Sequence, residues 1–175
     1  MNDFFPTEDY KIPVASNYMK LLEGENRFRV LSSAVIGWEY WNVDNKPVRS
    51  KDEFDGIPAD IKLVKDKNGK ITPAGVSHFW AFVVWNYDAK RVQILEIKQK
   101  GIMQYIQSLV KNPKWGSPKG YDLVITRTGS GFDTEYSTVA EPHSVIDYAI
   151  TEKYESMNIN LEALYTGDDP FAVKV

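Results

Sequence analysis

The sequence contains no cysteine, and its two histidines, His78 and His143, are far apart in the chain. The lack of cysteine excludes disulfides, a thiol nucleophile, iron–sulfur clusters and cysteine-based zinc sites. The motifs GxxxxGK[ST], GxGxxG, GxSxG and HExxH are also missing, which removes the usual signatures of phosphate loops, dinucleotide sites, serine hydrolases and zinc proteases. These absences predict a protein that is not an enzyme and needs neither a metal nor another cofactor.

The sequence also lacks any run of about 18 apolar residues, the length that a membrane-spanning helix needs. Its first residues, MNDFFPTEDYKIP, carry acidic side chains where a signal peptide needs basic ones. We therefore expect a soluble, cytoplasmic protein with no membrane partner. The chain has 175 residues, of which 43% are hydrophobic and 26% charged. This composition is typical of one globular domain and excludes a largely disordered chain.

Charge is unevenly distributed, although the formal net charge is only −3. Residues 1–140 carry 19 Lys and Arg against 17 Asp and Glu, whereas residues 141–175 carry 2 against 7. Residues 90–119 contain seven Lys and Arg against the single acid Glu96. The sequence therefore predicts one distinctly basic segment and an acidic C-terminal end.

Hydrophobic periodicity predicts a mainly β fold with one inserted helix. A helix is expected over residues 101–112, where apolar residues recur at spacings of three and four before Asn112-Pro113. A hairpin is expected over residues 42–51, and a long loop with one short edge strand at 61–64 over residues 52–77. Period-two alternation or continuous apolar character predicts strands over 27–36 and on into WEYW, and over 78–87, 91–98, 121–128 and 134–141.

This order of elements is the one expected of an OB-fold, a five-stranded barrel with a helix before its fourth strand. A β-sandwich, or another α+β sheet with one covering helix, remains an alternative. We assign the OB-fold domain to residues 26–140. Residues 1–25 then form an N-terminal lead-in, and residues 141–175 form a helical, acidic C-terminal appendage.

Aromatic and cationic residues lie close together at several points of the chain. Binding of single-stranded nucleic acid requires rings on which bases stack and cations that meet the phosphates. The candidate stacking residues are Trp38, Tyr40, Trp41, Trp85 and Trp115. The candidate phosphate contacts are Lys46, Arg49, Arg91, Lys98 and Arg127. Four further rings are assigned to the core or left open, because alternation does not say which face of a two-sided apolar strand points inward: Phe28, Phe79, Trp80 and Phe82.

Two alternatives come from the same residues. Glu96-Ile97-Lys98 resembles the acidic-x-Lys signature of metal-dependent nucleases, which needs a second carboxylate at the same ion. Asp88 would lie roughly 25 Å away along the same strand, so an acid such as Asp60 or Glu39 would have to be recruited. The other alternative is an OB-fold protein-interaction module whose aromatic patch faces a polypeptide.

Three segments resemble bacteriophage single-stranded DNA-binding proteins of the OB-fold kind, and the resemblance covers about residues 26–140. The segments are FRVLSSAVIGWEYWN with KPVRS, HFWAFVVWNYDAKRVQILEIKQKGI, and WGSPKGYDLVITRTGSGFDTEYSTV. The last is the most specific. The resemblance implies a non-catalytic protein that coats single-stranded DNA during replication or recombination, in the host cytoplasm if it is phage-encoded. Replication or recombination proteins are then candidate partners for the acidic C-terminus. The best-known members carry a Cys/His zinc site, which this chain cannot form.

Overall fold

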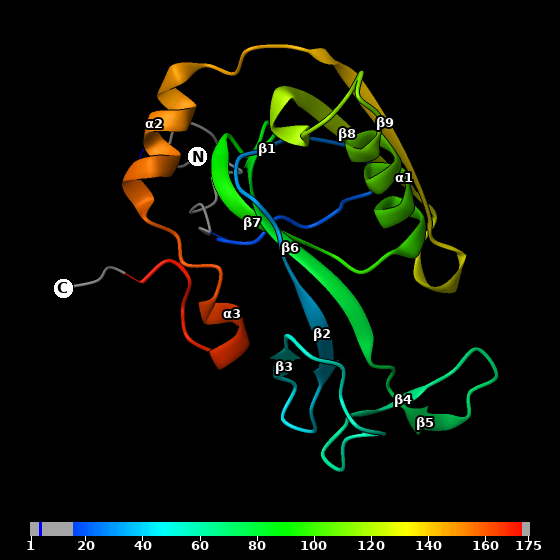
Figure 1. Ribbon diagram of the computed structural model, residues 1–175. Coiled ribbons are helices and arrows are strands. Elements are labelled where there is room, and N and C mark those ends of the chain that lie inside the picture. Colours follow the sequence, from blue (N-terminus) through cyan, green and yellow to red (C-terminus); the bar gives the residue numbers. More distant parts are fainter. Residues whose placement is uncertain (1–3, 5–15, 173–175) are drawn as a thin grey trace.

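The computed structural model describes residue 4 and residues 16–172, which form a curved antiparallel sheet with helices packed around it (Figure 1). The main sheet contains β1 (Gly24–Val30), β2 (Val35–Trp41), β3 (Pro47–Ser50), β6 (Ser77–Asn86), β7 (Arg91–Ile97), β8 (Tyr121–Thr128) and β9 (Glu135–His143). A separate two-stranded sheet contains β4 (Leu63–Lys65) and β5 (Ile71–Pro73). The α-helices are α1 (Lys100–Lys111), α2 (Tyr148–Met157) and α3 (Ala163–Thr166), and 3-10 turns occur at η1 (Pro118–Gly120) and η2 (Gly131–Asp133).

The predicted mainly β fold with a helix between strands is confirmed. The strands pair in the order β3-β2-β6-β1-β8-β9, and β7 pairs with the other edge of β6. The pairings among the described strands do not close this sheet into a barrel. β7 pairs with β6 and β9 pairs with β8, but β7 and β9 do not pair with each other. The structure therefore confirms the class of fold, and the OB-fold assignment stays a prediction.

The prediction of one continuous strand over residues 27–36 is wrong, because the chain leaves the sheet geometry at residues 31–34. The N–H of Leu31 donates to the carbonyl of Val83 (2.8 Å), and the N–H of Val83 donates to the hydroxyl of Ser32 (2.8 Å). These bonds hold the bend against the middle of β6. β1 then pairs with residues 84–86 of β6, and β2 pairs with residues 77–81.

β6 is apolar on both faces, as predicted, and each face belongs to a different core. Phe82 and Val84 point into a first core, which β1, β7, β8 and α1 complete. α1 contributes the amphipathic stripe that its spacing predicted, including Ile102 and Ile106. Phe79, Ala81 and Val83 point to the opposite face, into a second core. This alternation makes β6 the wall that separates the two halves of the molecule.

The C-terminal segment covers the outer face of β6 and β7. Leu164 is buried there, and residues of α2 and the following turn pack around it, among them Tyr154 and Met157. The hydroxyl of Tyr165 donates to the carbonyl of Ile36 (2.5 Å), which ties α3 to β2. The acidic segment therefore shares a hydrophobic core with the sheet, while the predicted domain boundary at residue 140 stays a prediction.

The predicted lead-in lies largely outside the described residues. Its last part is described and pairs with β7: the N–H of Met19 donates to the carbonyl of Ile94, and the N–H of Ile94 donates to the carbonyl of Asn17, each at 2.9 Å. No helix in the described ranges has the length and apolarity required to cross a membrane.

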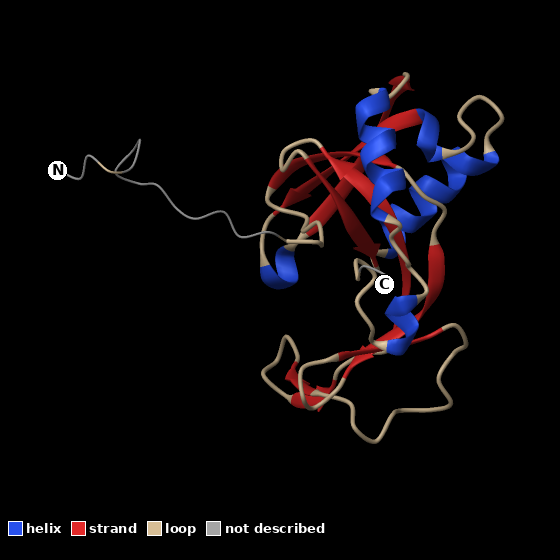
Figure 2. Ribbon diagram, turned by 90° about the vertical axis from the view of Figure 1, so that its left-hand side faces the viewer, coloured by secondary structure: helices blue, strands red, loops and turns tan. Residues whose placement is uncertain are grey.

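The predicted long loop over residues 52–77 contains the hairpin β4–β5. Figures 1 and 2 show that this part of the chain projects from the lower end of the molecule, away from α1 and α2. The short edge strand expected at 61–64 is found one to two residues later, at Leu63–Lys65, and it pairs with β5 instead of the main sheet.

Candidate nucleic-acid interface

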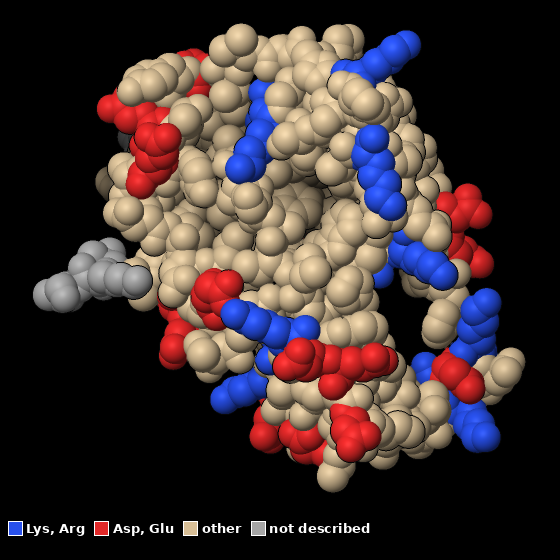
Figure 3. All heavy atoms as spheres, in the orientation of Figure 1, with Lys and Arg blue, Asp and Glu red and all other residues tan. Residues whose placement is uncertain are grey.

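A cavity of about 700 Å³ lies between the β2–β6 ladder and α1. It opens on the face shown in Figure 3, where a hollow lies at the centre and Lys and Arg side chains lie on both sides of it. Its volume is within the range of sites that hold small ligands, about 300 to 1,000 Å³. The lining residues are Val30, Ser32, Ser33, Ala34, Ile36, His78, Trp80, Phe82, Lys100, Met103, Gln104, Ile106, Gln107, Val110, Ser117, Pro118 and Lys119.

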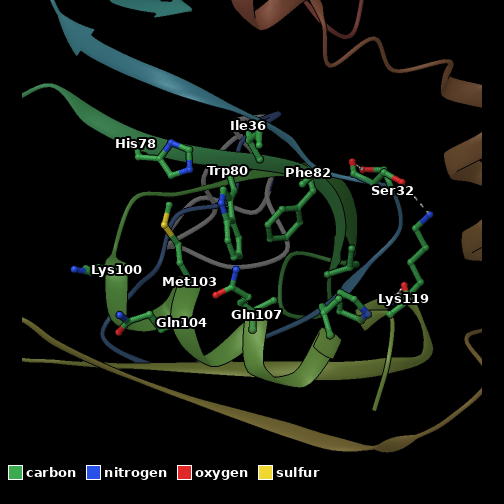
Figure 4. A pocket seen from close by; sticks show the side chains of 17 residues that line it. Ser32, Ile36, His78, Trp80, Phe82, Lys100, Met103, Gln104, Gln107 and Lys119 are labelled. Atoms are coloured by element: carbon green, nitrogen blue, oxygen red, sulfur yellow. Dashed lines mark hydrogen bonds between the residues drawn. The ribbon is translucent and has the colours of Figure 1, made fainter. Parts of the chain in front are cut away.

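The aromatic wall of the cavity follows from strand register. Trp80 pairs with Ile36, and His78 pairs with Trp38, so these side chains lie next to one another on one face of the ladder. Figure 4 shows His78, Trp80 and Phe82 projecting from β6 toward α1. Phe82 is buried, whereas Trp80 is only partly buried and packs against the first core. Trp80 is therefore the large ring that the cavity presents to a ligand.

Polar side chains line the opposite wall and the two ends of the cavity. α1 contributes the exposed amides Gln104 and Gln107. Lys100 and Lys119 lie at opposite ends of the view in Figure 4, and Lys119 reaches the hydroxyl of Ser33 at 3.5 Å. Within residues 16–172, neither ammonium group takes part in an ion pair. The cavity thus combines an aromatic wall with amide groups and two uncompensated cations.

Strand alternation divides the predicted stacking residues of β2 between two faces. Trp38 lies on the cavity side, with its ring 4.8 Å from that of His78. Tyr40 lies on the same side but is buried, and its hydroxyl donates to Asp60 (2.8 Å). Its ring therefore offers no free face to a base in this structure. Trp41 lies on the opposite side of the sheet, 41% exposed, so these three rings do not form one platform.

The two other predicted stacking residues pack against the protein. Trp85 is on the opposite face of β6 from Trp80 and packs against the second core. Trp115 lies between two rings, T-shaped to Tyr121 at 5.3 Å and stacked on His143 at 5.7 Å. Neither residue lines the cavity.

Two of the predicted phosphate contacts belong to a charge cluster on the other side of the sheet, formed by Glu39, Arg49, Glu96 and Lys98. Arg49 binds Glu39 (Nε to Oε2, 2.7 Å) and Glu96 (Nη2 to Oε2, 2.9 Å). Lys98 binds the same two carboxylates. Two cations are thus balanced by two acids, and a phosphate would have to break these ion pairs to reach Arg49 or Lys98.

The two carboxylates of this cluster have pKa values shifted in opposite directions. Burial raises the pKa of Glu96 from 4.5 to about 7, and the hydrogen bond and negative charge of Glu39 add to the effect. For Glu39, burial alone would raise the pKa, but hydrogen bonds with Glu96 and Lys98 and the charges of Lys98 and Arg49 lower it overall. Two close carboxylates that share a site commonly titrate apart in this way.

The nuclease alternative required a second acid beside Glu96, and Glu39 is the acid that the fold brings there. However, Arg49 and Lys98 already bind the oxygens of both carboxylates, which a divalent ion would need as ligands. Asp60, the other acid considered, accepts the hydroxyl of Tyr40 instead. The cluster is therefore built as a set of ion pairs.

The remaining predicted cations lie apart from the cavity. Lys46 is exposed in the turn between β2 and β3, and Arg91 begins β7. Arg127 donates from Nη1 to the carbonyl of Leu21 (3.0 Å), which ties β8 to the chain before β1. The role of these three residues in binding stays a prediction.

Sequence reasoning did not select the residues that the structure brings together at the cavity. The sequence alone assigns Trp80 to the core or leaves it open, and it shows Lys100 and Lys119 as cations of the basic segment 90–119. The sequence pattern that could have identified them is the alternation of side chains along a strand. It places His78, Trp80 and Phe82 on one face of β6, and the exposed polar positions of α1 form the opposite wall.

The chain is 28% identical over 137 residues to a protein of Escherichia phage T5 named "Probable ssDNA-binding protein". The matched region covers 68% of this chain and 52% of the phage protein, so the chain spans about half the length of that relative. No family model matches the chain, and no solved structure is significantly similar to it. The chain is therefore a distant relative of a phage protein whose name states probable binding of ssDNA.

Proposed function

We propose that this protein binds single-stranded DNA in the cavity between β6 and α1, without catalysis. The observation that carries the proposal is the partly exposed ring of Trp80 in an open cavity whose ends hold Lys100 and Lys119, neither of them ion-paired with a residue that the structure describes. An unpaired base can stack on the indole while the flanking phosphates meet the ammonium groups. A base inside a duplex is stacked on its neighbours and cannot enter such a site.

The resemblance to phage single-stranded DNA-binding proteins and the name of the T5 relative support the same ligand. The order of elements supports an OB-type sheet, since α1 follows β7 and precedes the hairpin β8–β9. On this proposal the protein acts in phage replication or recombination, and its acidic C-terminal segment remains the candidate contact for partner proteins.

A fluorescence titration tests the proposal. Oligo-dT should quench tryptophan emission, and the affinity should fall steeply with added salt, because phosphate binding releases counterions. Duplex DNA should compete poorly. An absence of both quenching and anisotropy change at low salt would refute the proposal, and equal binding of duplex would refute the stacking mechanism.

Neutralising the two cavity cations refines the test. Lys100→Gln with Lys119→Gln should reduce the slope of log K against log salt by roughly 1.4, at about 0.7 per phosphate contact on a single strand. The matched control is Lys20→Gln with Lys153→Gln, two exposed lysines that do not line the cavity. The control should leave the slope unchanged.

The same samples test the nuclease and the interaction module. Cleavage of labelled DNA with Mg²⁺ or Mn²⁺ that is abolished by Glu96→Ala would replace the binding proposal. Recovery of a protein partner from nuclease-treated extract, without competition by oligonucleotide, would favour the interaction module.

A further inference from the structure

The hairpin β4–β5 forms a basic arm, defined here as residues 62–74. The arm is a two-stranded sheet of its own and projects from the lower end of the molecule (Figures 1 and 2). It holds four lysines, Lys62, Lys65, Lys67 and Lys70, against the single acid Asp66. Its local excess of positive charge is therefore three.

The one acid of the arm is used by the backbone of its own turn. The carboxylate of Asp66 accepts the N–H groups of Asn68 and Lys70, each at 2.9 Å. Gly69 completes the turn with φ at +78°, a conformation that favours glycine. None of the four lysines takes part in an ion pair with any residue that the structure describes. Their charge is available to an anionic ligand.

The arm contains no aromatic residue, so it has no ring on which a base could stack. Its exposed apolar side chains are aliphatic, with Leu63 59% and Ile71 63% exposed. The arm therefore offers a nucleic-acid strand cations for its phosphates and no ring for stacking. This separates the arm chemically from the cavity, which offers both kinds of contact.

The base of the arm lies next to the cavity. The N–H of Lys62 donates to the carbonyl of Trp41 (2.9 Å), which anchors the arm to the end of β2. After the arm, the chain enters β6 within three residues and reaches His78, which lines the cavity. A second hollow of about 500 Å³ lies at the base, lined by Trp38, Glu53, Phe54, Gly56, Ile57, Ile61 and residues 72–76. Trp38 of this second hollow contacts His78 of the cavity, with ring centroids 4.8 Å apart, so the two hollows are neighbours.

We propose that the basic arm binds the phosphate backbone of the strand that leaves the cavity past His78 and Trp38. The proposal rests on the proposed function, because it extends the same binding site. A single strand that occupies the cavity continues along the second hollow and then meets the lysines of the arm. Short oligonucleotides fill the cavity only, whereas longer ones also reach the arm.

The test compares Lys67→Gln with Lys70→Gln against the control pair Lys20→Gln with Lys153→Gln. The turn should survive in the arm variant, because Asp66 binds backbone N–H groups and not these side chains. Binding is measured by anisotropy with labelled oligo-dT of about 4 and about 16 nucleotides, the limits of single-fold site sizes. Each pair is measured from 50 to 200 mM salt.

With the longer oligonucleotide, the arm variant should lose roughly 1.4 from the salt slope. Its loss of affinity across that salt range should then be about sevenfold smaller than that of the wild type. The short oligonucleotide should bind the arm variant and the wild type equally. If the arm variant matches the control pair on the longer oligonucleotide, the inference about the arm is refuted while the proposed function stands.

If the wild type binds neither oligonucleotide, the proposed function itself has failed. Lysines beside aliphatic residues also suit an anionic membrane surface, so vesicles of phosphatidylserine and phosphatidylcholine serve as a second probe. Vesicle binding that the arm variant loses, with an unchanged oligonucleotide slope, would overturn the proposal in favour of a lipid ligand.

Discussion

Replacing Trp80 by leucine should weaken binding of oligo-dT by roughly 5- to 150-fold. A base stacked on an aromatic side chain contributes about 1 to 3 kcal/mol, and about 1.4 kcal/mol corresponds to a tenfold change in affinity. Trp80 is the partly exposed ring of the cavity, so a stacked base there would lose its platform. Leucine keeps an apolar group against the first core, which limits the cost to the fold.

The matched control is Trp85→Leu. Trp85 lies on the same strand and is also partly buried, but it faces the second core on the other side of β6. Both substitutions remove an indole from the edge of a core, so each should lower the free energy of unfolding by about 1 to 3 kcal/mol. Only the Trp80 variant should lose affinity.

Two measurements decide this comparison. Anisotropy of a labelled oligo-dT gives the affinity of each variant, and urea unfolding gives its stability. Quenching of tryptophan emission by oligo-dT should also shrink in the Trp80 variant and persist in the Trp85 variant. Unchanged affinity of the Trp80 variant, or equal losses in both, would show that stacking in this cavity does not drive binding.

Two further predictions concern stability. The pKa of Glu96 is raised from 4.5 to about 7, so the folded protein holds this proton more tightly than the unfolded chain. The resulting stabilisation is fully present below about pH 4.5 and is lost as the pH rises through about 7. The loss of stability is at most about 3 kcal/mol, and the Glu96→Gln variant should not show it. Melting temperatures of wild type and variant at pH 5 and pH 8 test this prediction. A wild type whose stability rises from pH 5 to pH 8 would contradict it. The side chain of Asn26 accepts the N–H of Leu22 and donates to the carbonyls of Leu22 and Ile125 while buried. Asn26→Ala leaves buried backbone groups unpaired and should therefore lower the free energy of unfolding, measured in urea, by about 1 to 3 kcal/mol or more. A decrease of less than about 0.5 kcal/mol would refute this account.

Much of the secondary structure could be predicted from the sequence, because it depends on local periodicity. The two-sided apolar run at residues 78–87, the hairpins at 78–98 and 121–141 and the amphipathic helix near 101–112 are all present. The break at residues 31–34 could not be predicted. It is held by two hydrogen bonds with Val83, some fifty positions later in the chain: the N–H of Leu31 donates to the carbonyl of Val83, and the N–H of Val83 donates to the hydroxyl of Ser32.

The sequence by itself determined the mainly β class, the order of the elements and the basic character of residues 90–119. Only the tertiary structure decided which side chains face one another. It buried Tyr40 and matched Arg49 and Lys98 with Glu39 and Glu96. It also placed Trp80 opposite α1, between Lys100 and Lys119. Local patterns fix the period of a strand, whereas the face that stays open depends on which distant elements pack against it.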